Sequence, residues 1–363
     1  MTNRTQSRSA YMEFAKLRSG ARFNLASSGM AAFPLRELGV RIEQLEINGP
    51  DNYGYEPLKQ AIAHRYRVAE ECVVTAAGTS MANYLAMAAC ADPGDEVLIE
   101  QPTYGLLLDI ARYLGLTLRR FQRPAALDFQ VDLEDLKQNV SDRTKLIVLC
   151  NLHNPSSALL ANDTLHEIGR IAGSVGARVL VDEVYMEMLW QSQPQSAVHV
   201  APDAFISTNS LTKAYGLSGL RCGWALASPE VAERMWHIND LHGATAVYPA
   251  ELLSVIAFSK LDEIAAKQKS VLNQNRRLLR EVLESQSALE YFWPEHGTVV
   301  FPRLRSGNVD EVCERLKCEY EISVVPGSFF EDPERIRIGV GGATEDVRDS
   351  LAQLRLALPE LFS

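Results

Sequence analysis

The stretch NSLTKAYGLSGLRCGW, residues 209–224, decides how the rest of the chain is interpreted. Lys213 lies in it, with Ser210 three residues before and Arg221 eight residues after. Gly216, Gly219 and Gly223 follow the lysine and let the backbone turn tightly, so the stretch predicts a strand, a turn and a second strand. A hydroxyl and a guanidinium at this spacing can hold a phosphate beside the lysine. A lone lysine near glycines is usually a solvated loop residue, so this interpretation depends on the residues elsewhere in the chain.

Upstream of this stretch, short β-rich runs alternate with longer helical patterns. We expect strands at residues 72–75, 97–100, 117–121, 146–150, 179–182, 205–209 and 222–227, and helices at 81–91, 104–114, 164–175 and 229–238. This alternation is typical of a largely parallel sheet that helices cover on both faces. Ligands of such sheets bind at the carboxyl ends of the strands.

The pattern changes after Pro249. A helical tract reaches residue 285, and short strands are expected at 299–304, 322–325 and 335–340. A helix is also expected at residues 11–17. The chain exceeds the usual size of a single core, so we expect two domains. Residues 48–246 would form a large α/β domain, and residues 1–47 together with 247–363 a smaller α+β domain.

Composition and charge exclude several classes of protein. Lys and Arg number 36 against 46 Asp and Glu, which gives the 363 residues a net charge of −10 that repels nucleic acid and anionic membranes. The six cysteines are scattered and lack histidines at ligand spacing, so we expect no metal site and a reducing compartment. No apolar run approaches the roughly 20 residues of a membrane span, and the first ten residues lack a signal-peptide core. We therefore expect a cytoplasmic protein.

Two stretches after predicted strands carry groups that could bind a flat, phosphorylated ligand. Gly78, Thr79 and Ser80 lie where a helix begins, and the free N–H groups there attract phosphate. Tyr104 follows another strand, where its ring could stack on a planar ligand. In isolation, a capped helix start and a packed tyrosine explain these residues equally well.

Two further stretches supply polar groups. Asn154 precedes a proline after a hydrophobic strand and could donate to a phenolate oxygen, although an ordinary Asn-Pro turn is the commoner explanation. Asp182 ends a buried strand, where a carboxylate is costly unless it meets a cation such as a protonated pyridine nitrogen. Tyr185 could reach the same phenolic oxygen as Asn154.

Together these residues resemble the fold-type I pyridoxal 5'-phosphate (PLP) enzymes of the class I/II aminotransferase family, over residues 52–342. The segment SLTKAYGLSGLRCGW is the most specific part of the resemblance, which implies a PLP-transferase fold with a mostly parallel seven-stranded sheet. Lys213 would bind the cofactor as an aldimine. The family commonly continues its Asn-Pro motif with Thr-Gly, where this chain has Ser156 and Ser157. The cofactor-binding residues implied are Tyr53, Gly78, Thr79, Ser80, Tyr104, Asn154, Asp182, Tyr185, Ser210, Lys213 and Arg221.

The same resemblance implies the substrate contacts. Arg337 fits the arginine that holds the substrate carboxylate, with Asn154 beside it. Arg335 lies two residues away, and we expect only one of the two arginines to point into the site. Arg337 could alternatively be a structural residue paired with an acid such as Glu334 or Asp346. Tyr53 resembles a residue that completes the partner's phosphate site, which implies a homodimer.

We expect an aminotransferase that moves an amino group between an amino acid and a 2-oxo acid, with Lys213, Asp182 and Tyr185 as its catalytic residues. Desolvation and Arg221 would keep the lysine amine neutral enough to attack a carbonyl carbon and to take a proton. Another PLP reaction, such as β-elimination or oxidation, fits the same scaffold. A non-catalytic PLP-binding descendant is disfavoured because the full residue set is present, and a nicotinamide dehydrogenase because the glycines at 339–342 have the wrong spacing.

Overall fold

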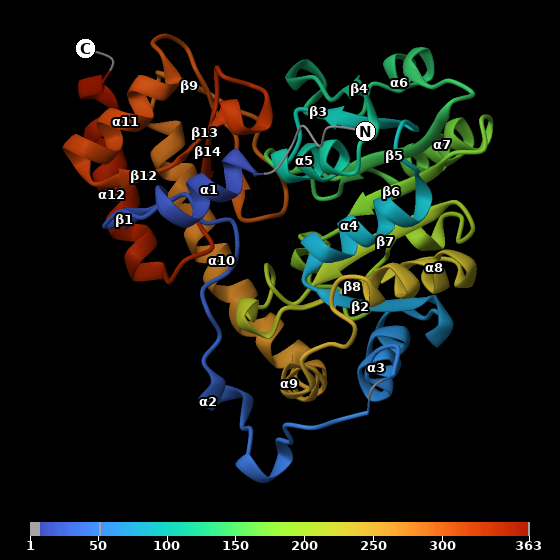
Figure 1. Ribbon diagram of the computed structural model, residues 1–363. Coiled ribbons are helices and arrows are strands. Elements are labelled where there is room, and N and C mark those ends of the chain that lie inside the picture. Colours follow the sequence, from blue (N-terminus) through green and yellow to red (C-terminus); the bar gives the residue numbers. More distant parts are fainter. Residues whose placement is uncertain (1–7, 51, 362–363) are drawn as a thin grey trace.

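The computed structural model describes residues 8–50 and 52–361, so part of the stretch that would hold a signal peptide lies outside it. A seven-stranded sheet forms its centre, in the order β2-β8-β7-β6-β5-β3-β4 (Figure 1). The predicted sheet is thus confirmed, with strand ends that differ from the predicted ones by at most two residues. Its strands are β2 (Val73–Ala77), β3 (Glu96–Gln101), β4 (Thr117–Gln122), β5 (Thr144–Cys150), β6 (Arg178–Asp182), β7 (Phe205–Ser210) and β8 (Cys222–Leu226).

Strand β8 is the exception to a common strand direction. It pairs antiparallel with both β2 and β7, whereas the other pairs of the sheet are parallel. The turn between β7 and β8 is the stretch that carries Lys213. The carboxyl ends of β2, β5, β6 and β7 therefore meet at one edge of the sheet.

Helices cover both faces of this sheet because successive strand residues point to opposite sides. Val97 and Ile99 of β3 pack in one core with helices α4, α5 and α8, whereas Leu98 packs in another core with α6 and α7. Helix α3 packs against α9 and β2. The bounds of these helices are α3 (Glu56–Tyr66), α4 (Thr79–Cys90), α5 (Gly105–Tyr113), α6 (Leu133–Asn139), α7 (Asn162–Gly173) and α8 (Pro229–Asp240).

The C-terminal part of the chain adds helices and short strands that lie outside the seven-stranded sheet. The predicted helical tract is divided at Ser259 and Lys260 into α9 (Tyr248–Phe258) and α10 (Leu261–Glu284). A three-stranded antiparallel sheet has the order β10-β14-β13, and β9 pairs with β11. The elements are β9 (Leu289–Glu290), β10 (Val299–Val300), β11 (Arg303–Leu304), α11 (Val309–Tyr320), β12 (Ile322–Ser323), β13 (Val325–Pro326), β14 (Ile336–Gly339) and α12 (Thr344–Leu361).

The N-terminal segment packs on this C-terminal part. Strand β1 (Phe23–Asn24) pairs in parallel with β12, and helix α1 (Ala10–Leu17) lies between the small strands and α5 (Figure 1). Helix α2 (Leu35–Leu38) follows on an extended connection. The exact domain limits at residues 48 and 246 stay a prediction. Within the described residues, no helix is long and apolar enough to cross a membrane.

Candidate active site

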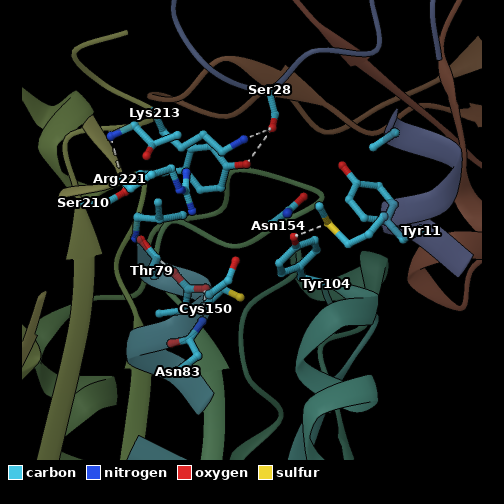
Figure 2. A pocket seen from close by; sticks show the side chains of 17 residues that line it. Tyr11, Ser28, Thr79, Asn83, Tyr104, Cys150, Asn154, Ser210, Lys213 and Arg221 are labelled. Carbon is cyan, nitrogen blue, oxygen red and sulfur yellow. Dashed lines mark hydrogen bonds between the residues drawn. The ribbon is translucent and has the colours of Figure 1, made fainter. Parts of the chain in front are cut away.

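A cavity of about 220 Å³ lies at the carboxyl ends of the strands, between the large sheet and the N-terminal segment. Figure 2 shows side chains from both parts of the chain pointing into it. Of the twelve residues predicted to bind cofactor or substrate, eleven lie in or beside this cavity. Nine of them line it: Thr79, Ser80, Tyr104, Asn154, Asp182, Tyr185, Ser210, Lys213 and Arg221. The other two are Gly78 and Arg337. Those two residues contact lining residues, so the structure brings these eleven together.

One end of the cavity is shaped for an anion. Gly78, with φ +80°, is the N-cap of α4, and a Cβ atom added to it would lie 2.3 Å from Nη2 of Arg221. That guanidinium donates to the carbonyl of Ala77 at 3.0 Å. The buried hydroxyl of Thr79 has no hydrogen-bond partner among the described residues. A helix N-terminus, a close guanidinium and an unpartnered hydroxyl fit a phosphate group.

A close approach of two backbone segments keeps this end narrow. A Cβ atom on Gly223 of β8 would lie 2.3 Å from the carbonyl carbon of Gly78, so only glycine fits there. Ser210, at the end of β7, is buried, and its Oγ accepts from the N–H of Thr212 at 3.3 Å. Ser80 also lines the cavity, from the first turn of α4. The spacing of Ser210 and Arg221 around the turn places both near the start of α4.

The base of the cavity carries a buried carboxylate. Asp182 accepts from Nδ2 of Asn83 at 2.8 Å and from the N–H of Val184 at 3.1 Å. Burial raises the pKa of the Asp182 carboxyl, and the hydrogen bond from Asn83 opposes that rise. The carboxylate forms no ion pair with any residue in the described part of the chain. It therefore fits a ligand that brings its own cation, such as a protonated pyridine nitrogen.

Lys213 projects into the middle of the cavity. Burial lowers the pKa of its amine to about 8, and the positive charges of Arg337 and Arg221 act in the same direction. The amine donates to Oγ of Ser28 at 3.0 Å, and the phenol of Tyr185 donates to the same oxygen at 2.9 Å (Figure 2). A substantial fraction of the amine is therefore neutral near physiological pH, as a nucleophile or a base must be.

Arg337 is a buried cation that has no acidic partner among the residues that the structure describes. It donates to Asn154 Oδ1, to the hydroxyl of Tyr11 and to the carbonyl of Ala26, each at 3.0 Å. Its Nε is buried and has no hydrogen-bond partner among residues 8–50 and 52–361. Because these partners are neutral, the guanidinium can take a carboxylate from a ligand.

The neighbouring arginine differs. Arg335 donates to Asp332 at 2.8 Å and to the carbonyl of Phe301 at 3.1 Å, so its charge is already paired. Glu334 pairs with Arg303 instead of Arg337. The contacts thus oppose the alternative in which Glu334 pairs with Arg337, and they favour Arg337 over Arg335 as the ligand-binding arginine.

Aromatic residues close another side of the cavity. The ring of Tyr104 meets that of Tyr11 edge to face, with centroids 5.3 Å apart, and its hydroxyl donates to Sδ of Met12 at 3.3 Å. Tyr53 lies elsewhere: it is 48% exposed, and its hydroxyl donates to Asp240 at 3.0 Å. Within one chain, Tyr53 is therefore absent from the cavity lining.

The turn after β5 holds Asn154 although the chain lacks the usual Thr-Gly. Ser157 adopts φ +61°, a conformation that favours glycine, and its Oγ donates to the carbonyl of Val299 at 2.9 Å. Ser156 Oγ lies 2.7 Å from Nδ1 of His153. Burial lowers the pKa of the His153 ring, so the imidazole is neutral. Side-chain hydrogen bonds thus hold this turn, although Ser157 adopts a backbone conformation that glycine favours.

Three residues of this site, Tyr11, Ser28 and Asn83, are not predicted by any pattern in the sequence considered above. Asn83 follows Thr79 by four residues, so the helical period could have placed it on the same face of α4. Tyr11 and Ser28 belong to a segment with no local motif. Within the described residues there is no group of His, Cys, Asp and Glu that could hold a metal ion.

Comparisons with known proteins agree with this geometry. A family model described as aminotransferase class I and II matches residues 39–354. Capreomycidine synthase of Streptomyces vinaceus is 30% identical over 92% of this chain and 89% of its own length. An aspartate aminotransferase of Streptomyces avermitilis is 24% identical over 92% of this chain and 88% of its own. A solved PLP-dependent aminotransferase from Streptococcus suis superposes with a TM-score of 0.91 at 26% identity, over 98% of both chains.

Proposed function

Because the chain belongs to the class I and II aminotransferases, a PLP-dependent family, we propose that it moves an amino group between an amino acid and a 2-oxo acid. The observation that carries this proposal is the buried guanidinium of Arg337, which has no acidic partner in the described part of the chain and lies in the same site as Lys213 and Asp182. A substrate carboxylate would satisfy the first of these groups. Lys213 would react with the aldehyde of the cofactor, and Asp182 would pair with its protonated pyridine nitrogen.

The fit of the cofactor rests on its two ends. Gly78, Thr79 and Arg221 would hold the phosphate, since they leave a narrow space lined by donors. Asp182 would hold the pyridine nitrogen in its protonated form. Nδ2 of Asn154 would donate to the phenolic oxygen, because Oδ1 of Asn154 is already used by Arg337. Tyr185, whose single hydroxyl hydrogen points to Ser28 in this structure, would turn that hydrogen to the phenolic oxygen when the cofactor is bound. When bound, the cofactor supplies an electron sink for charge that develops at the substrate α-carbon.

The chain's own residues would then carry the proton. Lys213, with a pKa of about 8, can take a proton from the substrate α-carbon and return it at another carbon, the shift that transamination requires. Arg337 fixes the carboxylate, which selects the C–H bond instead of the C–COO⁻ bond for cleavage. Tyr11 and Tyr104 exclude water on the side of helix α1.

A second candidate function is supported by one comparison. The relative at 30% identity is a synthase, not an aminotransferase by name. Fold and cofactor do not determine which bond reacts, so another PLP reaction on an amino acid, such as a β-elimination, is the alternative.

One experiment separates the two candidates. Purified protein loaded with PLP is mixed with single amino acids from a panel, and the products are analysed. Transamination yields a 2-oxo acid without ammonia, and the cofactor becomes the amine form until a second 2-oxo acid is added. Elimination releases ammonia and leaves the cofactor in its aldehyde form. Ammonia in amounts equal to the oxo acid would overturn the first proposal in favour of the second.

We also propose a homodimer in which Tyr53 reaches the partner's site. Tyr53 lies outside the cavity of its own chain and is half exposed on the surface near α8. A second hollow, lined by Asn52, Gly54 and Arg221 among others, adjoins the phosphate end. Light scattering would give twice the chain mass. A fully active monomer at nanomolar concentration would contradict the proposal.

A further inference from the structure

Ser28 joins the two functional side chains that surround the centre of the cavity. Its Oγ accepts from Lys213 Nζ at 3.0 Å and from Tyr185 Oη at 2.9 Å, and only 4% of the residue is exposed (Figure 2). The sequence between residues 26 and 29 has no motif that would assign a role to it. The contact is therefore an observation of the structure alone.

The backbone around Ser28 is fixed from several directions. The carbonyl of Ser28 accepts from Thr298 Oγ1 at 2.6 Å, and the N–H of Met30 donates to the carbonyl of Lys213 itself at 2.8 Å. A Cβ atom on Gly29 would lie 3.4 Å from Cδ of Lys213, so the segment packs closely on the lysine stem. These contacts tie the serine to the residue that it touches.

The hydrogen-bonding capacity of the hydroxyl explains what the contact does. A serine oxygen accepts two hydrogen bonds and donates one, and here Lys213 and Tyr185 supply the two donors. When the neutral amine donates a hydrogen to Ser28, its lone pair must point elsewhere. The hydrogen bond thereby restrains rotation of the amine and turns its lone pair away from Ser28.

We propose that Ser28 is a positioning residue that orients the free amine of Lys213 toward the substrate α-carbon. The proposal rests on the proposed function, in which Lys213 takes and returns a proton. Displacing a base by about 1 Å can slow a reaction roughly 100-fold, so the loss of one hydroxyl that positions the base can have a large effect.

Ser28 also affects the protonated lysine. The charged or protonatable groups that act on or contact the amine are Arg337, Asp182, Arg221 and Tyr185. The two arginines oppose a positive charge on Nζ, while Asp182 favours it. A hydrogen bond from an ammonium is stronger than one from a neutral amine, so Ser28, like Asp182, favours the protonated form of Lys213.

The test compares Ser28→Ala with Ser28→Thr, which keeps the hydroxyl. Ser27→Ala is the matched control, because Ser27 is the adjacent serine and is exposed. In cofactor-free protein, labelling of Lys213 by an amine-reactive reagent is followed across pH by peptide mass spectrometry. Loss of the hydroxyl should move the labelling midpoint from about pH 8 to lower pH, by about 0.5 to 1 unit.

A second measurement uses the loaded enzyme. Exchange of the substrate α-hydrogen with solvent deuterium should slow about 10- to 100-fold in Ser28→Ala, with KM changed less than about threefold. Ser28→Thr should recover most of the rate, and Ser27→Ala should match the unaltered protein. If Ser28→Ala does not fold, Ser28→Cys serves instead, since a thiol is a weak acceptor.

The outcomes separate this inference from the proposed function. If both the labelling midpoint and the exchange rate of Ser28→Ala equal those of Ser27→Ala, Ser28 does not position the lysine. If the unaltered protein exchanges no α-hydrogen with any amino acid, the proposed function itself is wrong.

Discussion

The two sides of the cavity are built from different parts of the chain. The side that we propose binds the cofactor, called here the cofactor side, consists of Gly78, Asp182, Lys213 and Arg221, at or near the ends of strands in one sheet. The side that we propose binds the substrate, called here the substrate side, combines Ser28, Tyr11 and Arg337, from the first 30 residues and from β14. The first side belongs to one continuous sheet, whereas the second depends on contacts across 326 positions of sequence, as between Tyr11 and Arg337. The difference teaches that cofactor binding and substrate choice can change independently.

The largest effect is expected on the cofactor side. Lys213→Ala should lower turnover at least about 10⁴-fold, because it removes both the attachment point and the base. Borohydride reduction of the unaltered protein, followed by peptide mapping, should find the pyridoxyl group on Lys213. Lys145→Ala is the control, since Lys145 is exposed on β5. A pyridoxyl group on any other lysine would show that Lys213 is not the residue that binds the cofactor.

The next effect tests the substrate side alone. Arg337→Ala should raise the activation free energy with an amino acid by about 2–5 kcal/mol, a loss of roughly 30- to 5,000-fold in kcat/KM, with the cofactor spectrum nearly unchanged. The decarboxylated amine should be much less affected. Arg335→Ala is the matched control, because its guanidinium pairs with Asp332 and its loss should lower stability instead. Equal losses of kcat/KM with the amino acid and with its decarboxylated amine would show that Arg337 does not bind the substrate carboxylate.

The two sides meet in the pKa of Lys213. In cofactor-free protein, PLP capture should be roughly 100-fold slower two pH units below the pKa of about 8, because only the neutral amine reacts. The rate should reach a plateau above that pKa. Arg337 holds the pKa down, so Arg337→Ala should shift the midpoint to higher pH. Stopped-flow absorbance measures both profiles. Identical midpoints would show that the two sides are electrostatically separate.

The smallest effect concerns the hydroxyl that Arg337 contacts. Tyr11→Phe should raise KM for amino acids roughly threefold to tenfold, which corresponds to about 0.5–1.5 kcal/mol, and leave PLP affinity unchanged. Steady-state kinetics and a cofactor titration measure the two quantities. Phe14→Leu, on the same helix but outside the cavity lining, is the control. A loss of PLP affinity in Tyr11→Phe would show that Tyr11 contributes to the cofactor side as well as to the substrate side.

The same division explains what the sequence could predict. Asp182 ends a strand with a clear hydrophobic run, and Lys213 and Arg221 lie in the turn between the next two strands, so strand ends and side-chain chemistry together indicate the site. Arg337 was identified by resemblance, but its preference over Arg335 required the observed contacts with Asn154 and Asp332. Ser28 carries no signal, because nothing in residues 26–29 shows that the segment will lie against Lys213 185 positions later.

The pairing of β1 with β12 has a consequence for the newly made chain. Phe23 faces Ile322 in that pair, so the first strand cannot find its neighbour until most of the polypeptide has left the ribosome. Contacts of such sequence separation form slowly, since a long loop must close before they are made. The central sheet can assemble during translation, while Tyr11 and Ser28 wait for the C-terminal strands. A nascent chain could thus acquire a place for the cofactor before it acquires one for the substrate.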